Sequence, residues 1–153
     1  MKKSIRSLAM LAVSVLTLAS CGKSKVSYDD FHSAATSVEA SDYNYVAFSG
    51  KYTAKLLGVT STVDLSKVTA TKTSSGWGTA DGTETAQTTV ALALIIDTAA
   101  TVGKSDDYKY YSGDGFKVEY DADGKKYDEW NKYGLLTKTT DGTNTITLSW
   151  SKK

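Results

Sequence analysis

The last third of the chain alternates between apolar and polar residues and is interrupted by closely spaced turn-forming residues. The alternation begins at Tyr108, and the turns are Asp121–Gly124, Asn131–Gly134 and Asp141-Gly142. Successive side chains of a strand point to opposite faces, and Asp-Gly between two such runs is a strong β-hairpin signal. The pattern therefore predicts a meander of short antiparallel strands with one buried face.

Two stretches in the middle of the chain also have strand character. Tyr43 to Leu57 alternates over its whole length, which predicts a long half-buried strand with a bend at Gly50. Thr60 to Ser74 is rich in valine and threonine, which favour strands, and predicts one further strand or two. Gly76-Trp77-Gly78 predicts a turn or a strand end.

A helix is expected near the start of the domain. Ser27 is followed three residues later by Asp30, which is typical of a helix N-cap. Apolar residues then recur from Phe31 to Val38 with the spacing of one helix face. We predict a helix from Tyr28 to Ala40 with one face to bury.

A second helix is expected over Ala86 to Ala100, the most apolar stretch after residue 21. Its length and the cap-like sequence Asp81–Glu84 favour a buried helix, whereas its β-branched residues and threonines favour a strand. We interpret it as a helix.

The N-terminus is organised like an export signal. Three basic residues lie within the first six, and Leu8 to Leu18 is apolar apart from one serine and one threonine. This run of about eleven residues falls well short of the ~20 that span a bilayer. The small residues Ala19 and Ser20 follow it and precede Cys21. The N-terminus therefore predicts a cleaved signal.

Leu18-Ala19-Ser20-Cys21 resembles the lipobox of bacterial lipoproteins, and Cys21 is the only cysteine in the chain. The resemblance implies cleavage before Cys21 and a diacylglyceryl group on its sulfur. It implies a domain outside the cytoplasm, anchored by lipid to the bacterial cell membrane or outer membrane. The alternative is an ordinary signal peptide with an accidental cysteine. We predict a signal peptide over residues 1–20, a lipidated, flexible tether over 21–27 and a single domain over 28–153.

Composition disfavours several functions for the exported part. Three of the 18 basic residues lie in the predicted signal peptide, so acidic residues slightly outnumber basic ones in the remainder. No basic run or stripe is present, which argues against a nucleic-acid partner. A single cysteine also precludes an intramolecular disulfide.

No residue pattern indicates catalysis. His32 is the only histidine and lies on the polar side of its predicted helix, so histidine-based triads and zinc sites lack a basis. Glu119–Gly124 resembles part of a calcium loop, but Trp130 occupies the place of the last acidic ligand, so we interpret it as a hairpin turn. Adjacent acids such as Asp128 and Glu129 would point to opposite faces of a strand. We predict a non-enzymatic protein without a cofactor or metal.

The order helix, strands, helix, strands predicts an α+β fold. We expect a curved antiparallel sheet, with the N-terminal helix and a second helix packed on its concave face. This order, together with the lipid anchor, resembles the half-barrel of bacterial lipoprotein carriers and related mycobacterial lipid-binding lipoproteins. The resemblance implies an apolar ligand held between the sheet and the helices.

Aromatic residues gather in the last third of the chain and supply the candidate binding residues. Amphipathic rings can hold an acyl chain or stack on a sugar. The candidates are Tyr110, Phe116, Tyr120, Trp130 and Tyr133. If such rings line an enclosed space, the protein binds a hydrophobic ligand such as a lipid. If Tyr110, Trp130 and Tyr133 form an exposed patch, it is instead a surface module that binds glycan or protein.

Overall fold

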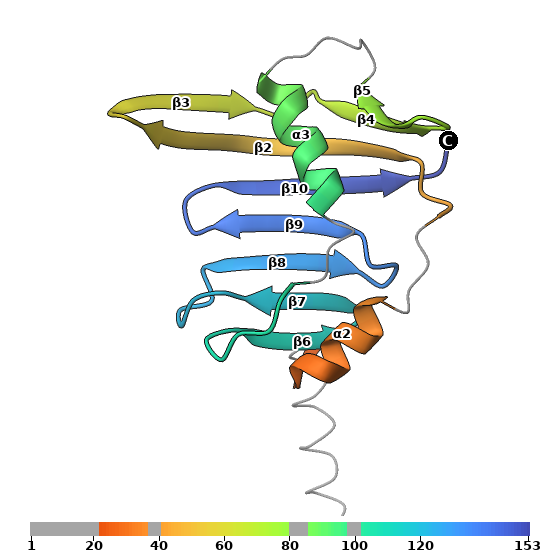
Figure 1. The fold of residues 1–153 in the computed structure, drawn as a ribbon, viewed down its shortest axis with the longest axis vertical. Coiled ribbons are helices and arrows are strands. Elements are labelled where there is room, and N and C mark those ends of the chain that lie inside the picture. The colour runs from red at the N-terminus through yellow and green to blue at the C-terminus, as the bar shows by residue number, and fades with distance from the viewer. Residues whose placement is uncertain (1–21, 37–40, 80–85, 98–101) are drawn as a thin grey trace, which may run out of the picture.

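The structure, a computed structural model, describes residues 22–36, 41–79, 86–97 and 102–153. Within these residues the chain forms one open, antiparallel, ten-stranded sheet and two short helices (Figure 1). The predicted combination of an antiparallel sheet with two helices is therefore confirmed.

The sheet does not follow the order of the chain throughout. Its strands lie in the order β1-β6-β7-β8-β9-β10-β2-β4-β5, and β3 pairs with the distal end of β2. The helices are α2 (Tyr28–Thr36) and α3 (Ala86–Asp97). The strands are β1 (Lys23–Val26), β2 (Tyr45–Leu56), β3 (Val59–Asp64), β4 (Thr69–Thr73), β5 (Gly76–Thr79), β6 (Lys109–Gly113), β7 (Gly115–Glu119), β8 (Lys126–Asn131), β9 (Leu136–Asp141) and β10 (Thr145–Ser151).

The predicted C-terminal meander is confirmed, because β6 to β10 are consecutive antiparallel neighbours. Each of its last three turns contains a glycine with positive φ: Gly124 at 68°, Gly134 at 73° and Gly142 at 92°. Residues with a side chain rarely adopt a positive φ, whereas glycine does so readily. Glycine at these positions therefore allows the tight turns at which the strands end.

The middle of the chain is also close to expectation. Gly50 has a φ of 116°, and a Cβ there would lie 2.2 Å from the carbonyl oxygen of Thr145, so the bend requires glycine. The stretch from Thr60 to Ser74 contributes to two strands, β3 and β4. Gly76-Trp77-Gly78 is the main part of β5, where the Trp77 ring packs edge-on against Trp150 at 5.5 Å.

Strand β1 corrects the prediction of a flexible tether. Residues 23–26 pair with β6 in antiparallel register, with Val26 opposite Tyr110. The pairing supplies backbone hydrogen-bond partners to an otherwise open edge of the sheet. Four polar-rich residues are too few to reveal a strand that forms only because β6 offers an edge.

The first helix begins at the predicted cap. The Ser27 side chain accepts a hydrogen bond from the Asp30 amide at 3.1 Å, and its hydroxyl donates to the Asp30 carboxylate at 2.6 Å. The second apolar segment is a helix from Ala86 to Asp97, as predicted. The remainder of both predicted helices, residues 37–40 and 98–100, and the proposed cap at 81–84 lie outside the described residues.

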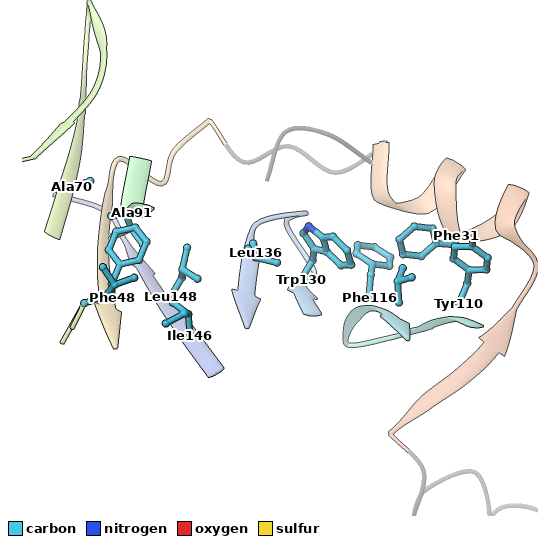
Figure 2. Packing of buried hydrophobic residues seen from close by; sticks show 13 residues of the cluster. Phe31, Phe48, Ala70, Ala91, Tyr110, Phe116, Trp130, Leu136, Ile146 and Leu148 are labelled. Carbon is cyan, nitrogen blue, oxygen red and sulfur yellow. The ribbon is translucent and has the colours of Figure 1, made fainter. Parts of the chain in front are cut away.

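One face of the sheet carries the core. Residues opposite each other in an antiparallel pair share a face, and the pairs Phe116–Trp130, Phe48–Leu148 and Val46–Ala70 are all buried. Phe31 of α2 and Ala91 of α3 belong to the same cluster, and both helices lie over this face (Figures 1 and 2).

The other face is polar, and no described helix covers it. Lys117, Glu129 and Lys138 lie in one row across β7, β8 and β9. The Tyr127 ring lies beneath two ammonium groups, 4.1 Å from Lys117 and 5.4 Å from Lys138. The described part of the chain is therefore a single sheet with one apolar, helix-covered face.

Candidate functional site

The sheet beneath α2 is packed solidly with rings. Phe31 is only 1% exposed, and its ring centroid lies 5.3 Å from Tyr110, 6.2 Å from Phe116 and 5.9 Å from Trp130. The last two contacts are edge-to-face, which aromatic pairs favour. Three of the five candidate binding residues therefore surround a helix side chain and serve as core (Figure 2).

The hydroxyl groups of this region bond within the protein. The Tyr110 hydroxyl donates to the Gly103 carbonyl at 3.1 Å and accepts from the Ser105 amide at 3.0 Å. The Tyr120 hydroxyl donates to the Asp128 carboxylate at 2.7 Å. Burial, followed by this hydrogen bond, raises the pKa of Tyr120 well above its ordinary value. Tyr110 therefore holds the loop at residues 103–105 against β6, and Tyr120 is hydrogen-bonded to β8.

Tyr133 lies apart from the other four candidates. It is half-buried in the β8–β9 turn, where its ring packs against Tyr43 at a centroid distance of 4.9 Å. Lys132 and Lys152 place ammonium groups 5.1 Å from the Tyr133 ring and 5.4 Å from the Tyr43 ring, respectively. Tyr110 and Trp130 are 5% and 8% exposed, so they do not form an exposed patch with Tyr133.

A cavity of about 290 Å³ lies between α3 and the sheet. Its walls come from α3 on one side and from β2, β9 and β10 on the other, so it is open space within the helix-covered layer. Most of the lining groups are apolar or small. The lining residues are Tyr52, Val90, Ala93, Leu94, Thr139, Thr140, Asp141, Asn144 and Ile146.

One end of this cavity is polar, because it is formed by the β9–β10 turn. The buried Asn144 side chain accepts from the Thr53 amide at 2.9 Å and donates to the Thr53 carbonyl at 3.0 Å. It also donates to the Asp141 carboxylate at 2.8 Å. Backbone and side-chain hydrogen bonds from Asn144 lower the pKa of Asp141, which is therefore ionised at neutral pH. The end of the cavity thus combines a fixed negative charge with neighbouring threonine hydroxyls.

Only the α3 side of this cavity can be predicted from the sequence. Val90 and Leu94 are four residues apart on a predicted helix, which places them on one face. Thr139 and Asn144 carry no comparable signal, because their place in the lining depends on how β9, β10 and β2 align.

The remaining sequence candidates have simple structural roles or lie outside the described residues. His32 stacks on Tyr28 at 5.5 Å along α2. Glu119–Gly124 spans the β7–β8 turn, where the Lys125 amide donates to Asp121 at 2.7 Å. Cys21 is outside the described residues.

The described residues include neither a metal-binding cluster nor a membrane-spanning helix. They contain no group of three or more histidine, cysteine, aspartate or glutamate side chains placed to hold a metal ion. None of the described helices is long and apolar enough to cross a membrane.

Comparison with known proteins does not assign the chain to a class. No protein family, no curated protein and no solved structure matches it.

Proposed function

We propose that the protein is a lipid-anchored bacterial lipoprotein, not an enzyme, that binds a hydrophobic ligand between α3 and the sheet. The cavity beneath α3 is the observation that carries this proposal. A site for an apolar ligand is usually concave and mostly apolar, with a few placed polar groups. The α3 cavity has this composition, since aliphatic side chains of α3 face it and the polar groups lie at the β9–β10 turn.

The volume of the cavity limits the ligand. At about 290 Å³ it is at the lower end of the ~300–1,000 Å³ typical of ligand pockets. One acyl chain, or part of one, suits this space better than a bulky multi-chain lipid. The ligand's polar end would lie near Thr140 and Asn144. The Asp141 carboxylate disfavours an anionic headgroup at this end and favours a neutral or cationic one.

The proposed architecture is a half-barrel with both helices on its concave side. Two observations support it: the sheet is open, and α2 and α3 lie over the same face of it (Figure 1). In such a shape the helices cover the concave face of the sheet. Phe31 fills the space between α2 and the sheet, and the cavity between α3 and the sheet is available to a ligand.

Native mass spectrometry of the full chain, produced in bacteria and extracted in detergent, tests ligand binding. We expect a bound molecule of lipid mass that leaves the folded protein on collisional activation. Protein that is repeatedly free of any such molecule, whatever the extraction detergent, would overturn the ligand proposal.

The anchor is tested separately by Cys21→Ser. The substitution removes the only sulfur nucleophile available for thioether formation, so metabolic fatty-acid labelling should be lost. Residue 21 precedes the sheet, so the circular dichroism of the domain should not change. Equal labelling of both proteins would show that Leu18–Cys21 is not a lipobox.

A surface interaction module remains the second candidate, now at a different place. The half-exposed Tyr43–Tyr133 pair, with Lys132 and Lys152 beside it, is a platform on which a sugar ring can stack. Glycan-array binding that is lost in Tyr133→Ala would support this candidate. Binding that survives the substitution would exclude this platform.

A further inference from the structure

The β2–β3 hairpin presents apolar side chains to solvent at its tip. Leu56, Leu57 and Val59 are 74%, 97% and 69% exposed. The ribbon extends beyond the neighbouring strand β10, whose pairing with β2 ends at Lys51 (Figure 1). Most large aliphatic residues in the described chain belong to the core, so this tip is an exception.

Folding does not explain the leucine in the turn of this hairpin. Leu57 and Gly58 form the two-residue turn, with φ values of 50° and 82°. Such turns favour asparagine, aspartate or glycine, because positive φ is strained for other side chains. A leucine there is unfavourable for the turn and, at 97% exposure, adds nothing to the core. Its apolar surface is therefore available for contact with something outside the chain.

The charge of the hairpin restricts what that contact can be. Residues 52–63 contain no acidic residue, and Lys55 is their one charged group. At the base of the hairpin, Lys51 and Asp64 form an ion pair at 3.7 Å, and their charges cancel. The ribbon therefore has a net charge of one positive unit, carried by Lys55. An apolar tip with one adjacent ammonium group complements a layer of phosphates above hydrocarbon.

The backbone limits how deeply the tip can enter such a layer. Between Thr53 and the turn, the edge of β2 that faces away from β3 has no hydrogen-bonded strand beside it in the described chain. Strand β3 likewise pairs with β2 alone, so its other edge is also open. Hydrocarbon cannot satisfy free N–H and C=O groups. Only the turn and the side chains beside it can therefore enter, which corresponds to the interfacial region of a bilayer.

We propose that the tip formed by Leu56, Leu57 and Val59 inserts into the interfacial region of a phospholipid bilayer, with Lys55 at the phosphates. Tyr52, on the same face of the ribbon as Leu56, lines the α3 cavity. The hairpin would thus hold the cavity near the membrane. Insertion requires neither a lipid on Cys21 nor a ligand in the cavity.

The test measures the depth of residue 57 in vesicles of phosphatidylcholine and phosphatidylglycerol with brominated acyl chains. The probe is the full chain carrying Leu57→Trp, and the background is the parent protein with its three native tryptophans. The matched control is Ser74→Trp, in the exposed β4–β5 turn at the opposite end of β2. Bromine quenches tryptophan only at short range, so an anchored but uninserted hairpin is not quenched.

We expect brominated lipid to quench the added fluorescence of Leu57→Trp several-fold more than that of Ser74→Trp. The Leu57→Trp emission should also shift to the blue only when vesicles are present. Equal quenching of the two variants, or none in either, would overturn the proposal. A blue shift that depends on protein concentration without lipid would overturn it in favour of contact between two copies of the chain. Both positions are exposed, and circular dichroism verifies folding.

Discussion

The two helices cover one sheet face but leave different interiors beneath them. Under α2 a single large ring, Phe31, fills the space among three other rings. On α3 the buried side chains among the described residues are Thr88 and Ala91, and about 290 Å³ stays open between the helix and the sheet. The same arrangement of helix on sheet thus gives a solid core around the large Phe31 ring and an open space beside the small Ala91.

The largest difference in stability between the α2 side and the α3 side of the sheet is expected for Phe31→Ala. Removal of a fully buried ring from packed surroundings lowers the free energy of unfolding by ~3–5 kcal/mol. Leu94→Ala, which only widens an existing cavity at a half-buried position, should lower it by about 1 kcal/mol. Urea denaturation of both variants measures the difference. Equal losses would mean that the α3 side is as tightly packed as the α2 side.

The next effect concerns the polar end of the cavity. Asn144→Ala removes the side chain that pairs with the Thr53 backbone and with Asp141, so the free energy of unfolding should fall by about 2 kcal/mol. Hydrogen exchange should show early loss of protection at the Thr53 amide. The neighbouring exposed Thr143→Ala is the control, and a similar loss there would show that Asn144 has no special role.

A smaller effect should appear at alkaline pH on the α2 side. The pKa of Tyr120 is raised in the folded state by burial and by Asp128, so folding favours its protonated form. This contribution is complete below the unfolded pKa of about 10 and is lost as pH rises above it. Thermal denaturation at increasing pH should therefore show a steeper decline for the wild type than for Tyr120→Phe. Parallel curves would contradict the assignment.

The smallest effect should appear at acid pH on the α3 side. Hydrogen bonds from Asn144 and Thr143 lower the pKa of Asp141, so its stabilising contribution is present at neutral pH. It is lost as pH falls below the unfolded pKa of about 3.9 and through the folded value. Asp141→Asn should flatten part of the acid decline in melting temperature. Because Asp64 is also lowered in pKa by its bonds to Ser66, some decline should remain.

Local patterns predicted the elements whose causes are local. The Ser27 cap and the Asp141-Gly142 turn each depend on residues near one another in the sequence. The burial of Phe31 agrees with the apolar spacing of its predicted helix. These are the parts of the fold where sequence and structure agree.

Features that depend on distant register were not predictable in this way. Asn144 bonds Thr53 across 91 residues of chain, and β1 forms only because β6 offers it an edge. The candidate rings Tyr110, Phe116 and Trp130 have the composition of a binding surface. Their burial depends on Phe31, which comes from a separate element.

Binding of a fluorescent monoacylglycerol, whose headgroup is neutral, to the full chain tests most directly whether the α3 cavity is the ligand site. Thr139→Phe places a ring in the floor of the cavity, whereas Thr147→Phe makes the same change at an exposed position on the opposite face of the sheet. Circular dichroism verifies that both variants fold. We predict that Thr139→Phe abolishes saturable binding and that Thr147→Phe binds like the wild type. Unchanged binding in Thr139→Phe, or loss in Thr147→Phe alone, would contradict a ligand site beneath α3.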